Sequence, residues 1–169
     1  ARINNSPQIR VKVDDPMNLE LAKAFNTKFI LNSPFRDKSL RKEAFKLDKR
    51  ILVYEGGESL RLRKNAIDEG IEGMLRVMKH LKMRTEAPAK EKESILIMKS
   101  SWIRAKSAGL HYGFQRNGSG IEKKEILGRV CDPYGTYEVQ IKSPLDGFII
   151  AINNNPVVNR GDALFHVGN

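Results

Sequence analysis

The segment Ile51–Gly57 (Ile-Leu-Val-Tyr-Glu-Gly-Gly) contains a carboxylate in a setting that suits acid–base chemistry. Four apolar or aromatic residues in a row, preceded by basic residues and followed by two glycines, predict a short strand buried on both faces in the middle of a parallel sheet. Glu55 would then lie at the carboxyl end of that strand, where open α/β sheets hold their ligands, and the glycines would let the backbone turn beside it. Glu55 is therefore a candidate general base. The alternative is a strand-end glutamate in water or paired with a nearby lysine.

The chain around this segment alternates between strand and helix patterns. Residues 8–13 alternate apolar and polar side chains, and residues 28–31 form a short apolar run, so both predict strands. One helix is predicted from Pro16 to about Phe25, after Asp15 as N-cap, and a second runs from the N-cap Ser39 to about Leu47. A third helix begins at Asn65. We expect the third helix to face the core with its larger apolar residues: Ile67, Ile71, Met74, Leu75, Met78 and Leu81. Residues 1–83 therefore predict part of a layered α/β sheet domain.

The remainder of the chain has a different pattern. Residues 84–94 are charged and lack hydrophobic periodicity, which predicts a linker. Residues 95–169 contain an internal repeat, in which 103–109 resembles 141–147 and 121–130 resembles 158–167. Two such halves predict an all-β sandwich that resembles the biotinyl/lipoyl carrier fold. The turn between the halves has no lysine to carry a modification, so we expect this part to shape a neighbouring site or to support a homo-oligomer.

Charge and composition narrow the function classes. The formal net charge is +10, from 30 Lys and Arg against 20 Asp and Glu, and the excess is spread over the whole chain. No basic run is interleaved with aromatic residues, so we expect no nucleic-acid partner, whereas a diffuse positive field would attract anionic small molecules. The single cysteine, Cys131, gives no internal disulfide, and no apolar run approaches the roughly 20 residues that span a bilayer. These features predict a soluble cytoplasmic protein that does not bind membranes.

Metal ligands and nucleophiles are poorly represented in the chain. None of the three histidines, His80, His111 and His166, has a histidine or carboxylate at a close metal-ligand spacing. His111 lies in a predicted glycine-flanked loop, so it is a candidate for contact with a ligand, and the alternative is a structural role. No base is near Cys131 in sequence, which disfavours a thiol nucleophile. We therefore predict no metal ligands within this chain.

Several short motifs occur in a fixed order along almost the whole chain. They are Pro7–Arg10 with Asp14-Asp15-Pro16, Ser39-Leu-Arg41, Tyr54-Glu-Gly-Gly57, the helix from Asn65, Leu127–Gly135, Ser143–Gly147, and Asn155-Pro156 through Gly168. In this order they make the chain similar to the succinylglutamate desuccinylase/aspartoacylase family of zinc-dependent deacylases. The resemblance implies a carboxypeptidase-like α/β sheet domain followed by the β part.

The resemblance also implies an activity. It implies hydrolysis of the amide bond of an N-acyl amino acid or similar small amide, with a zinc-activated water and Glu55 as general base. Arg41 matches an arginine of the family and is implied to hold a substrate carboxylate, with Arg2 and Arg10 as further candidates. The alternative for Arg41 is an exposed arginine on a helix.

Family members bind zinc through a His-x-x-Glu pair and a later His, all upstream of the matched region. We therefore expect this chain to be the C-terminal part of such an enzyme and to be inactive alone, with its zinc ligands outside residues 1–169. The alternative is a catalytically silent binding or assembly module.

Overall fold

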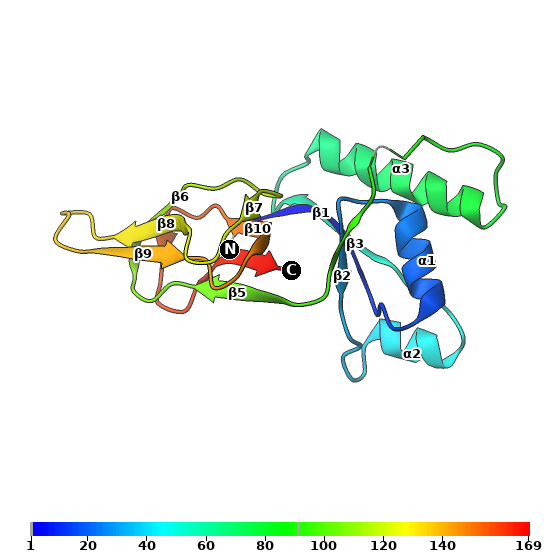
Figure 1. The fold of residues 1–169 in the computed structure, drawn as a ribbon, viewed down its shortest axis with the longest axis horizontal. Coiled ribbons are helices and arrows are strands. Elements are labelled where there is room, and N and C mark those ends of the chain that lie inside the picture. The colour runs from blue at the N-terminus through cyan, green and yellow to red at the C-terminus, as the bar shows by residue number, and fades with distance from the viewer. Residues whose placement is uncertain (1, 91) are drawn as a thin grey trace. The chain divides into compact units, whose positions relative to one another are not determined.

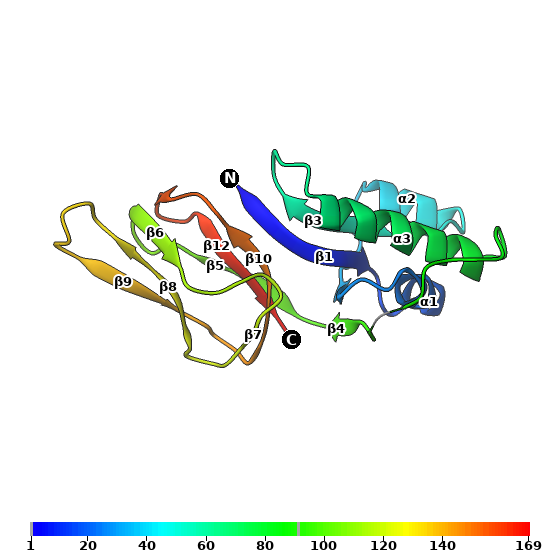
Figure 2. The ribbon, with the colours of Figure 1, turned by 90° about the horizontal axis from the view of Figure 1, so that it is seen from above.

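The computed structural model describes residues 2–90 and 92–169, which form two compact units. The β unit contains residues up to Ser6 together with 58–61 and 99–169, and the α/β unit contains residues 7–57 and 62–98. Figures 1 and 2 show their helices and strands from two directions. Residues 95–98 belong to the α/β unit and residues up to Ser6 to the β unit, and the predicted domain ranges stay predictions. No helix in the described part of the chain has the length and apolar character needed to cross a membrane.

The α/β unit is built on a short parallel sheet. Its strands are β1 (Ile3–Val11), β2 (Phe29–Asn32), β3 (Val53–Glu58) and β4 (Ile95–Ile97), and its helices are α1 (Pro16–Phe25), α2 (Leu40–Lys46) and α3 (Lys64–His80). β2 runs parallel to both β1 and β4, and β3 pairs with β1. The predicted helix starts at Pro16 and Ser39 are confirmed: Asp15 is the N-cap of α1, and the Ser39 hydroxyl accepts a hydrogen bond from the Lys42 amide.

The apolar face of β1 forms the core of this unit. Ile9 and Val11 are fully buried and pack with Ala22 and Phe25 of α1 and with Ile30 of β2. This confirms the strand that the alternation in residues 8–13 predicts, with its apolar side chains on one face. The alternate residues of β1 face the opposite side of the sheet.

The predicted environment of the segment 51–57 is wrong. β3 begins at Val53 and continues through both glycines to Glu58, so Glu55 lies within the strand and not at its end. Val53, Tyr54 and Glu55 are half-buried, and in the described residues β3 pairs with β1 alone, which makes it an edge strand. Gly57 has a φ of +81°, a left-handed conformation that favours glycine, yet the chain stays extended around it.

The predicted core face of α3 is also wrong. Ile67, Ile71 and Met74 are 45–53% exposed, and the helix packs through its small residues instead. A Cβ atom on Gly73 would lie 2.1 Å from the Phe25 ring, and one on Gly70 would lie 2.9 Å from the Tyr54 ring. The absence of these two Cβ atoms lets α3 approach α1 and β3 closely.

The end of helix α1 is tied to α3 by an arginine. The buried side chain of Arg76 donates a hydrogen bond from Nε to the Phe25 carbonyl at 3.0 Å. Phe25 is the last residue of α1, where backbone carbonyls lack partners within the helix. A cation at this end also interacts favourably with the helix dipole. Arg76 therefore stabilises the contact that the two glycines permit.

The β unit consists of two repeats of four strands. The first contains β5 (Ser100–Arg104), β6 (Gly109–Gly113), β7 (Gly120–Ile121) and β8 (Ile126–Cys131), and the second contains β9 (Glu138–Lys142), β10 (Gly147–Asn153), β11 (Val157–Val158) and β12 (Ala163–Gly168). β9 and β10 start 38 residues after β5 and β6 (138 − 100 and 147 − 109). β11 and β12 start 37 residues after β7 and β8 (157 − 120 and 163 − 126). These intervals equal the 38- and 37-residue offsets between the similar stretches of the sequence.

Strand pairing obeys the same repeat. The first repeat contributes the pairs β5–β12, β6–β8 and β6–β11. The equivalent pairs of the second repeat are β9–β8, β10–β12 and β10–β7. Strands of each repeat thus pair with strands of the other, so neither repeat forms these sheets alone. The first residues of β1 add an antiparallel partner to β10, with Ile3 opposite Asn153. The sandwich arrangement and the likeness to the biotinyl/lipoyl carrier fold stay predictions.

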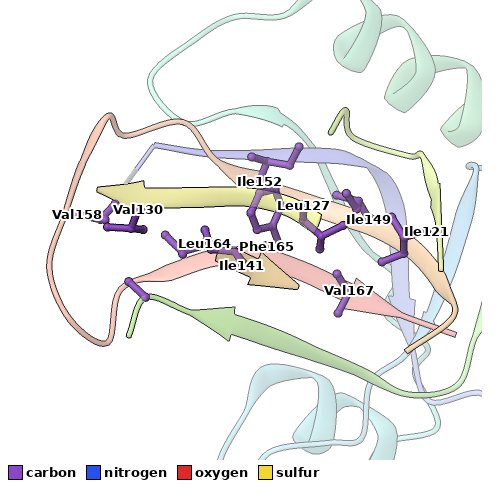
Figure 3. Packing of buried hydrophobic residues seen from close by; sticks show 11 residues of the cluster. Ile121, Leu127, Val130, Ile141, Ile149, Ile152, Val158, Leu164, Phe165 and Val167 are labelled. Carbon is purple, nitrogen blue, oxygen red and sulfur yellow. The ribbon is translucent and has the colours of Figure 1, made fainter. Parts of the chain in front are cut away.

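One hydrophobic cluster links strands of both repeats. Leu127, Val130 and Ile141 from β8 and β9 pack with Leu164 and Phe165 from β12. Figure 3 shows these side chains directed toward one another between the strands. Leu127, Leu164 and Phe165 are fully buried, so the cluster is shielded from water.

Replacing Gly73 with alanine is expected to destabilise the protein. The added Cβ would enter the space of the Phe25 ring, and overpacking of this kind costs about 1–3 kcal/mol, more than the roughly 1 kcal/mol that alanine gains in helix propensity. Gly70→Ala is the matched control, because its nearest ring atom is 2.9 Å away and a small ring movement relieves the contact. Urea unfolding should give a larger loss for Gly73→Ala than for Gly70→Ala. A Gly73→Ala protein as stable as the parent would contradict this packing.

Tyr54 is expected to make the free energy of unfolding depend on pH in the alkaline range. Its hydroxyl donates to the Ala66 carbonyl at 2.6 Å, and burial raises the pKa of Tyr54 to about 12, with the charge of Glu69 adding to the rise. The folded state favours the neutral phenol. The contribution of Tyr54 to the free energy of unfolding is therefore complete below pH 10, the ordinary pKa of the group, and is lost as the pH rises from 10 to about 12. Tyr54→Phe should cost about 0.5–1.5 kcal/mol of unfolding free energy at neutral pH.

The measurement is urea unfolding of the parent and Tyr54→Phe proteins at several pH values. The difference between them should narrow between pH 10 and 12. Tyr134→Phe is the control, since Tyr134 is 89% exposed and its replacement should leave stability unchanged throughout. A difference that is constant across this pH interval would show that the phenol does not titrate as described.

Candidate active site

Strand β1 presents polar side chains on the face opposite the core of the α/β unit. Gln8 and Arg10 occupy alternate positions of β1 and therefore share one face, while Ile9 and Val11 take the other. Gln8 is fully buried and Arg10 is half-buried, so this face is partly withdrawn from water. The neighbouring strand β3 places Glu55 beside it.

The carboxylate of Glu55 is held through one of its two oxygens. Gln8 donates from Nε2 to Glu55 Oε2 at 3.0 Å, and Arg10 Nε lies 3.0 Å from the same oxygen in a charge contact without hydrogen-bond geometry. The side chain of Glu55 is 37% exposed. Within residues 2–90 and 92–169 no donor reaches the other oxygen, Oε1. The two residues of β1 thus orient the carboxylate through Oε2.

Helix α2 brings Arg41 to the same region. Its Nη1 donates to the Ser33 carbonyl at 3.1 Å, and its Nη2 donates to Ser33 Oγ at 2.9 Å and to the Pro34 carbonyl at 3.4 Å. Burial lowers the pKa of the Arg41 guanidinium, the nearby charges of Arg10 and Arg36 lower it further, and the charge of Glu55 opposes them. Arg41 is therefore a half-buried, anchored side chain near Glu55 and Arg10, and not the exposed helical arginine of the alternative.

Two phenylalanine rings pack among these cations. Phe35 and Phe45 have centroids 5.0 Å apart, and Lys12 Nζ lies 5.8 and 5.7 Å from the two centroids. Arg41 Cζ lies 5.8 Å from the Phe35 centroid, and Arg50 Cζ lies 4.8 Å from that of Phe45. Cations over aromatic faces at these distances are attracted by the ring quadrupole. The rings thus hold several positive charges on one side of the unit.

The remaining sequence candidate, Arg2, belongs to the β unit. Its Nη2 lies 3.4 Å from Glu58 Oε1, and the same oxygen accepts a hydrogen bond from Asn154 Nδ2 at 3.2 Å. The Arg2 side chain is 43% exposed, whereas that of Glu58 is 4% exposed. The structure therefore gives Arg2 a structural partner, and its role in substrate binding stays a prediction.

Sequence reasoning singled out Glu55, Arg10 and Arg41, which the structure brings together, and missed Gln8 and the two rings. Gln8 could have been found, because a residue two positions before Arg10 on an alternating strand shares its face. Phe35 and Phe45 gave no such signal, since they lie in a loop and a short helix and meet only through the tertiary fold.

The three histidines have structural partners. His80 Nε2 lies 3.1 Å from Glu20 Oε1, and the His111 ring meets the edge of Phe165 with centroids 5.5 Å apart. His166 stacks on Trp102 with centroids 4.8 Å apart. In the ranges that the structure describes, no three His, Cys, Asp or Glu side chains gather into a group that could hold a metal ion. These residues therefore do not fit the predicted zinc by themselves.

Two cavities open elsewhere in the α/β unit. One of about 420 Å³ is lined by polar residues that include Asn26, Asp68 and Glu93, and the other, of about 440 Å³, is lined by residues that include Ala24 and His80. Glu55, Arg10 and Arg41 line neither. The chemistry of a site depends on its reactive groups more than on the volume of a cavity, so the group around Glu55 is the candidate site.

No protein-family model and no curated relative matches the sequence. Solved structures do match: 99% of this chain superimposes on 55% of the succinylglutamate desuccinylase/aspartoacylase from Rhodobacter sphaeroides, with a TM-score of 0.87 and 18% identity. It also superimposes on 54% of the product-bound ectoine utilization protein EutE (DoeB) from Ruegeria pomeroyi, with a TM-score of 0.85 and 16% identity.

An aspartoacylase family protein from Mesorhizobium loti gives a TM-score of 0.76 at 13% identity, over 99% of this chain and 58% of that one. Identities this low establish the fold and leave activity open. The chain spans about half the length of each of these three proteins. The resemblance predicted from the sequence is confirmed, and residues 1–169 have the fold of the matched half of solved succinylglutamate desuccinylase/aspartoacylase proteins.

Proposed function

We propose that the protein containing residues 1–169 hydrolyses the amide bond of an N-acyl amino acid or a similar small amide. The observation that carries this proposal is the carboxylate of Glu55, oriented by Gln8 and Arg10 through Oε2 with Oε1 open to a ligand. Fold likeness to solved desuccinylase and aspartoacylase proteins supports the same reaction class. Because the matched proteins are about twice as long, the activity belongs to the whole protein.

Glu55 would act as the general base. Its Oε1 accepts a proton from the water that attacks the amide carbonyl, so that a C–O bond forms as the proton leaves. The same oxygen returns this proton to the amine nitrogen as the C–N bond breaks, and the products are a carboxylic acid and an amine. The contacts with Gln8 and Arg10 restrict the rotation of the carboxylate, which keeps Oε1 in one position during both transfers.

Arg41 would bind the carboxylate of the amino-acid part of the substrate. Its three hydrogen bonds to Ser33 and Pro34 account for three of the five N–H donors of a guanidinium, so two remain for a ligand. A guanidinium suits a carboxylate in geometry as well as charge. Arg10 on this face of β1 and Lys12, which directly follows the strand, add positive charge, which favours an anionic substrate.

The predicted zinc is not part of these steps. The residues that the structure describes do not fit a metal ion by themselves, so ligands would have to come from polypeptide outside residues 1–169. The predicted cytoplasmic location and the homo-oligomer likewise stay predictions. The runner-up function, a catalytically silent binding or assembly module, would be supported if the whole natural protein, supplied with zinc, cleaved no member of a panel of N-acyl amino acids.

Glu55→Gln in the whole natural protein should lower kcat for N-acyl amino acids by about 10²–10⁴-fold, because glutamine keeps the shape of the side chain but accepts no proton. KM should change little, since Glu55 binds the attacking water and not the substrate carboxylate. Glu43→Gln is the matched control: Glu43 lies on α2 and pairs with Lys46 at 2.9 Å, away from Glu55. Equal turnover by the parent and the Glu55→Gln protein would remove Glu55 from the mechanism.

Arg41→Lys should raise KM by about 10-fold or more for a substrate with a free carboxylate, because one lysine ammonium cannot reach the substrate and also keep the contacts that Arg41 makes with Ser33 and Pro34. For the matching substrate with a carboxamide in place of the carboxylate, the parent and the variant should differ by less than about 3-fold. The exposed residue Arg36 supplies the control substitution, Arg36→Lys. If Arg41→Lys impairs both substrates equally, Arg41 has a structural role only.

A further inference from the structure

Strand β9 forms one edge of the smaller sheet in the β unit. This sheet has the order β11-β6-β8-β9, and within residues 2–90 and 92–169 β9 pairs with β8 alone. Its five residues, Glu-Val-Gln-Ile-Lys, include no proline or glycine, and the extra residue at the irregularity near Gly128 lies in β8. An edge strand has unpaired backbone groups that can accept a further strand. β9 therefore presents a regular edge that is suited to pairing.

The backbone of β9 turns alternate residues toward β8 and toward the open edge. The Ser143 amide donates a hydrogen bond to the Glu125 carbonyl at 2.9 Å, just before β8 begins. At the other end of β9, the Tyr137 carbonyl accepts a hydrogen bond from the Asp132 amide at 3.4 Å. Odd-numbered residues of this stretch therefore face β8, and even-numbered residues from 138 to 142 direct their N–H and C=O groups to the open edge. These groups are the donors and acceptors that one further strand needs.

The order of the side chains makes this edge complementary to itself. If two copies of β9 pair antiparallel about Gln140, Glu138 of one copy faces Lys142 of the other at both ends of the pairing. Opposite charges at facing positions stabilise a sheet. Because all three residues direct backbone groups to the edge, each facing pair exchanges two hydrogen bonds. Charge and hydrogen bonding thus select the same register.

Other registers lose these contacts. Moving one strand by two residues separates both charge pairs, and moving it by four places Glu138 opposite Glu138 or Lys142 opposite Lys142. In the favoured register, the half-buried Val139 faces Ile141 of the second copy. Ile141 is part of the buried hydrophobic cluster, and β-branched side chains are well suited to facing positions of a sheet. The favoured register therefore also shields Val139 from water.

We propose that β9 is the pairing surface for a second copy of this protein. Two β9 strands join antiparallel about Gln140, so that two four-stranded sheets become one continuous sheet across the dimer. The charges identify the occupant, because the two ends of one strand complement each other and a second copy brings the same strand. This inference concerns assembly and does not depend on the proposed hydrolysis.

Charge reversal in the whole natural protein tests the proposal. Sedimentation velocity over a 100-fold range of protein concentration should show the parent in a monomer–dimer equilibrium. Glu138→Lys should weaken dimerisation by about 10-fold or more, because both ends of the pairing would then carry like charges, and Lys142→Glu should do the same. Lys106→Glu is the matched control, since Lys106 is exposed and lies outside β9. It should leave dimerisation unchanged.

Mixing the two variants separates the pairing from local effects. Glu138 also contacts Arg129 of its own chain at 2.8 Å, so Glu138→Lys loses that contact as well. An equimolar mixture of the Glu138→Lys and Lys142→Glu proteins should nevertheless dimerise like the parent, since opposite charges face each other again at both ends. If one variant fails to fold, as judged by circular dichroism, the other tests the same edge.

Gln140→Pro tests the backbone part of the pairing. Proline removes an N–H group from the open edge, leaves the groups that face β8 in place, and should weaken dimerisation by about 10-fold or more. A parent that stays monomeric at every concentration would overturn the proposal. Dimerisation that Gln140→Pro leaves unchanged, that Lys106→Glu weakens equally, or that mixing does not restore would overturn it too.

Discussion

The close approach of helix α3 to helix α1 and strand β3 determines where the other parts of the α/β unit lie. Gly73 meets the ring of Phe25 and Gly70 meets the ring of Tyr54, at separations that leave no room for a Cβ atom. Interiors are densely packed, so an added carbon must displace the ring, by more at Gly73 than at Gly70. Because β3 alternates its side chains, fixing Tyr54 against α3 turns Glu55 to the opposite face, toward Arg10 and Gln8.

The carboxylate is thus positioned by elements of regular structure. Gln8 and Arg10 lie on a strand whose apolar residues are buried against α1, so their backbone positions are set by the core. Reactive groups on strands are held more accurately than groups on loops, and a fixed carboxylate needs little reorganisation when a proton moves. The positive charge of Arg10 beside Glu55 follows from the same alternation, because Arg10 must project to this face of β1 when Ile9 and Val11 face inward.

Local patterns in the sequence predicted much of this fold. Helix starts at Asp15-Pro16 and Ser39 depend on neighbouring residues alone, and the repeat in the β unit is visible as similar strings 38 and 37 residues apart. The packing face of α3 could not be predicted, since hydrophobicity favoured Ile67 and Met74, whereas a tertiary contact selected glycine. Likewise, four apolar residues before Glu55 predicted a buried strand because periodicity does not distinguish a central strand from an edge strand.

Helix α2 differs from the other elements near Glu55 in how it is attached. It has seven residues, none of which is buried, and it is held by the contacts of Arg41 with Ser33 and by the rings and cations around Phe45. Segments with so little buried apolar surface open at a small fraction of the global unfolding free energy, so we expect amide hydrogens of α2 to exchange well before those of β1. In its proposed role, Arg41 would reach a ligand only while this helix is closed. Substrate affinity would include the free energy of that closure, which links binding to a local folding equilibrium.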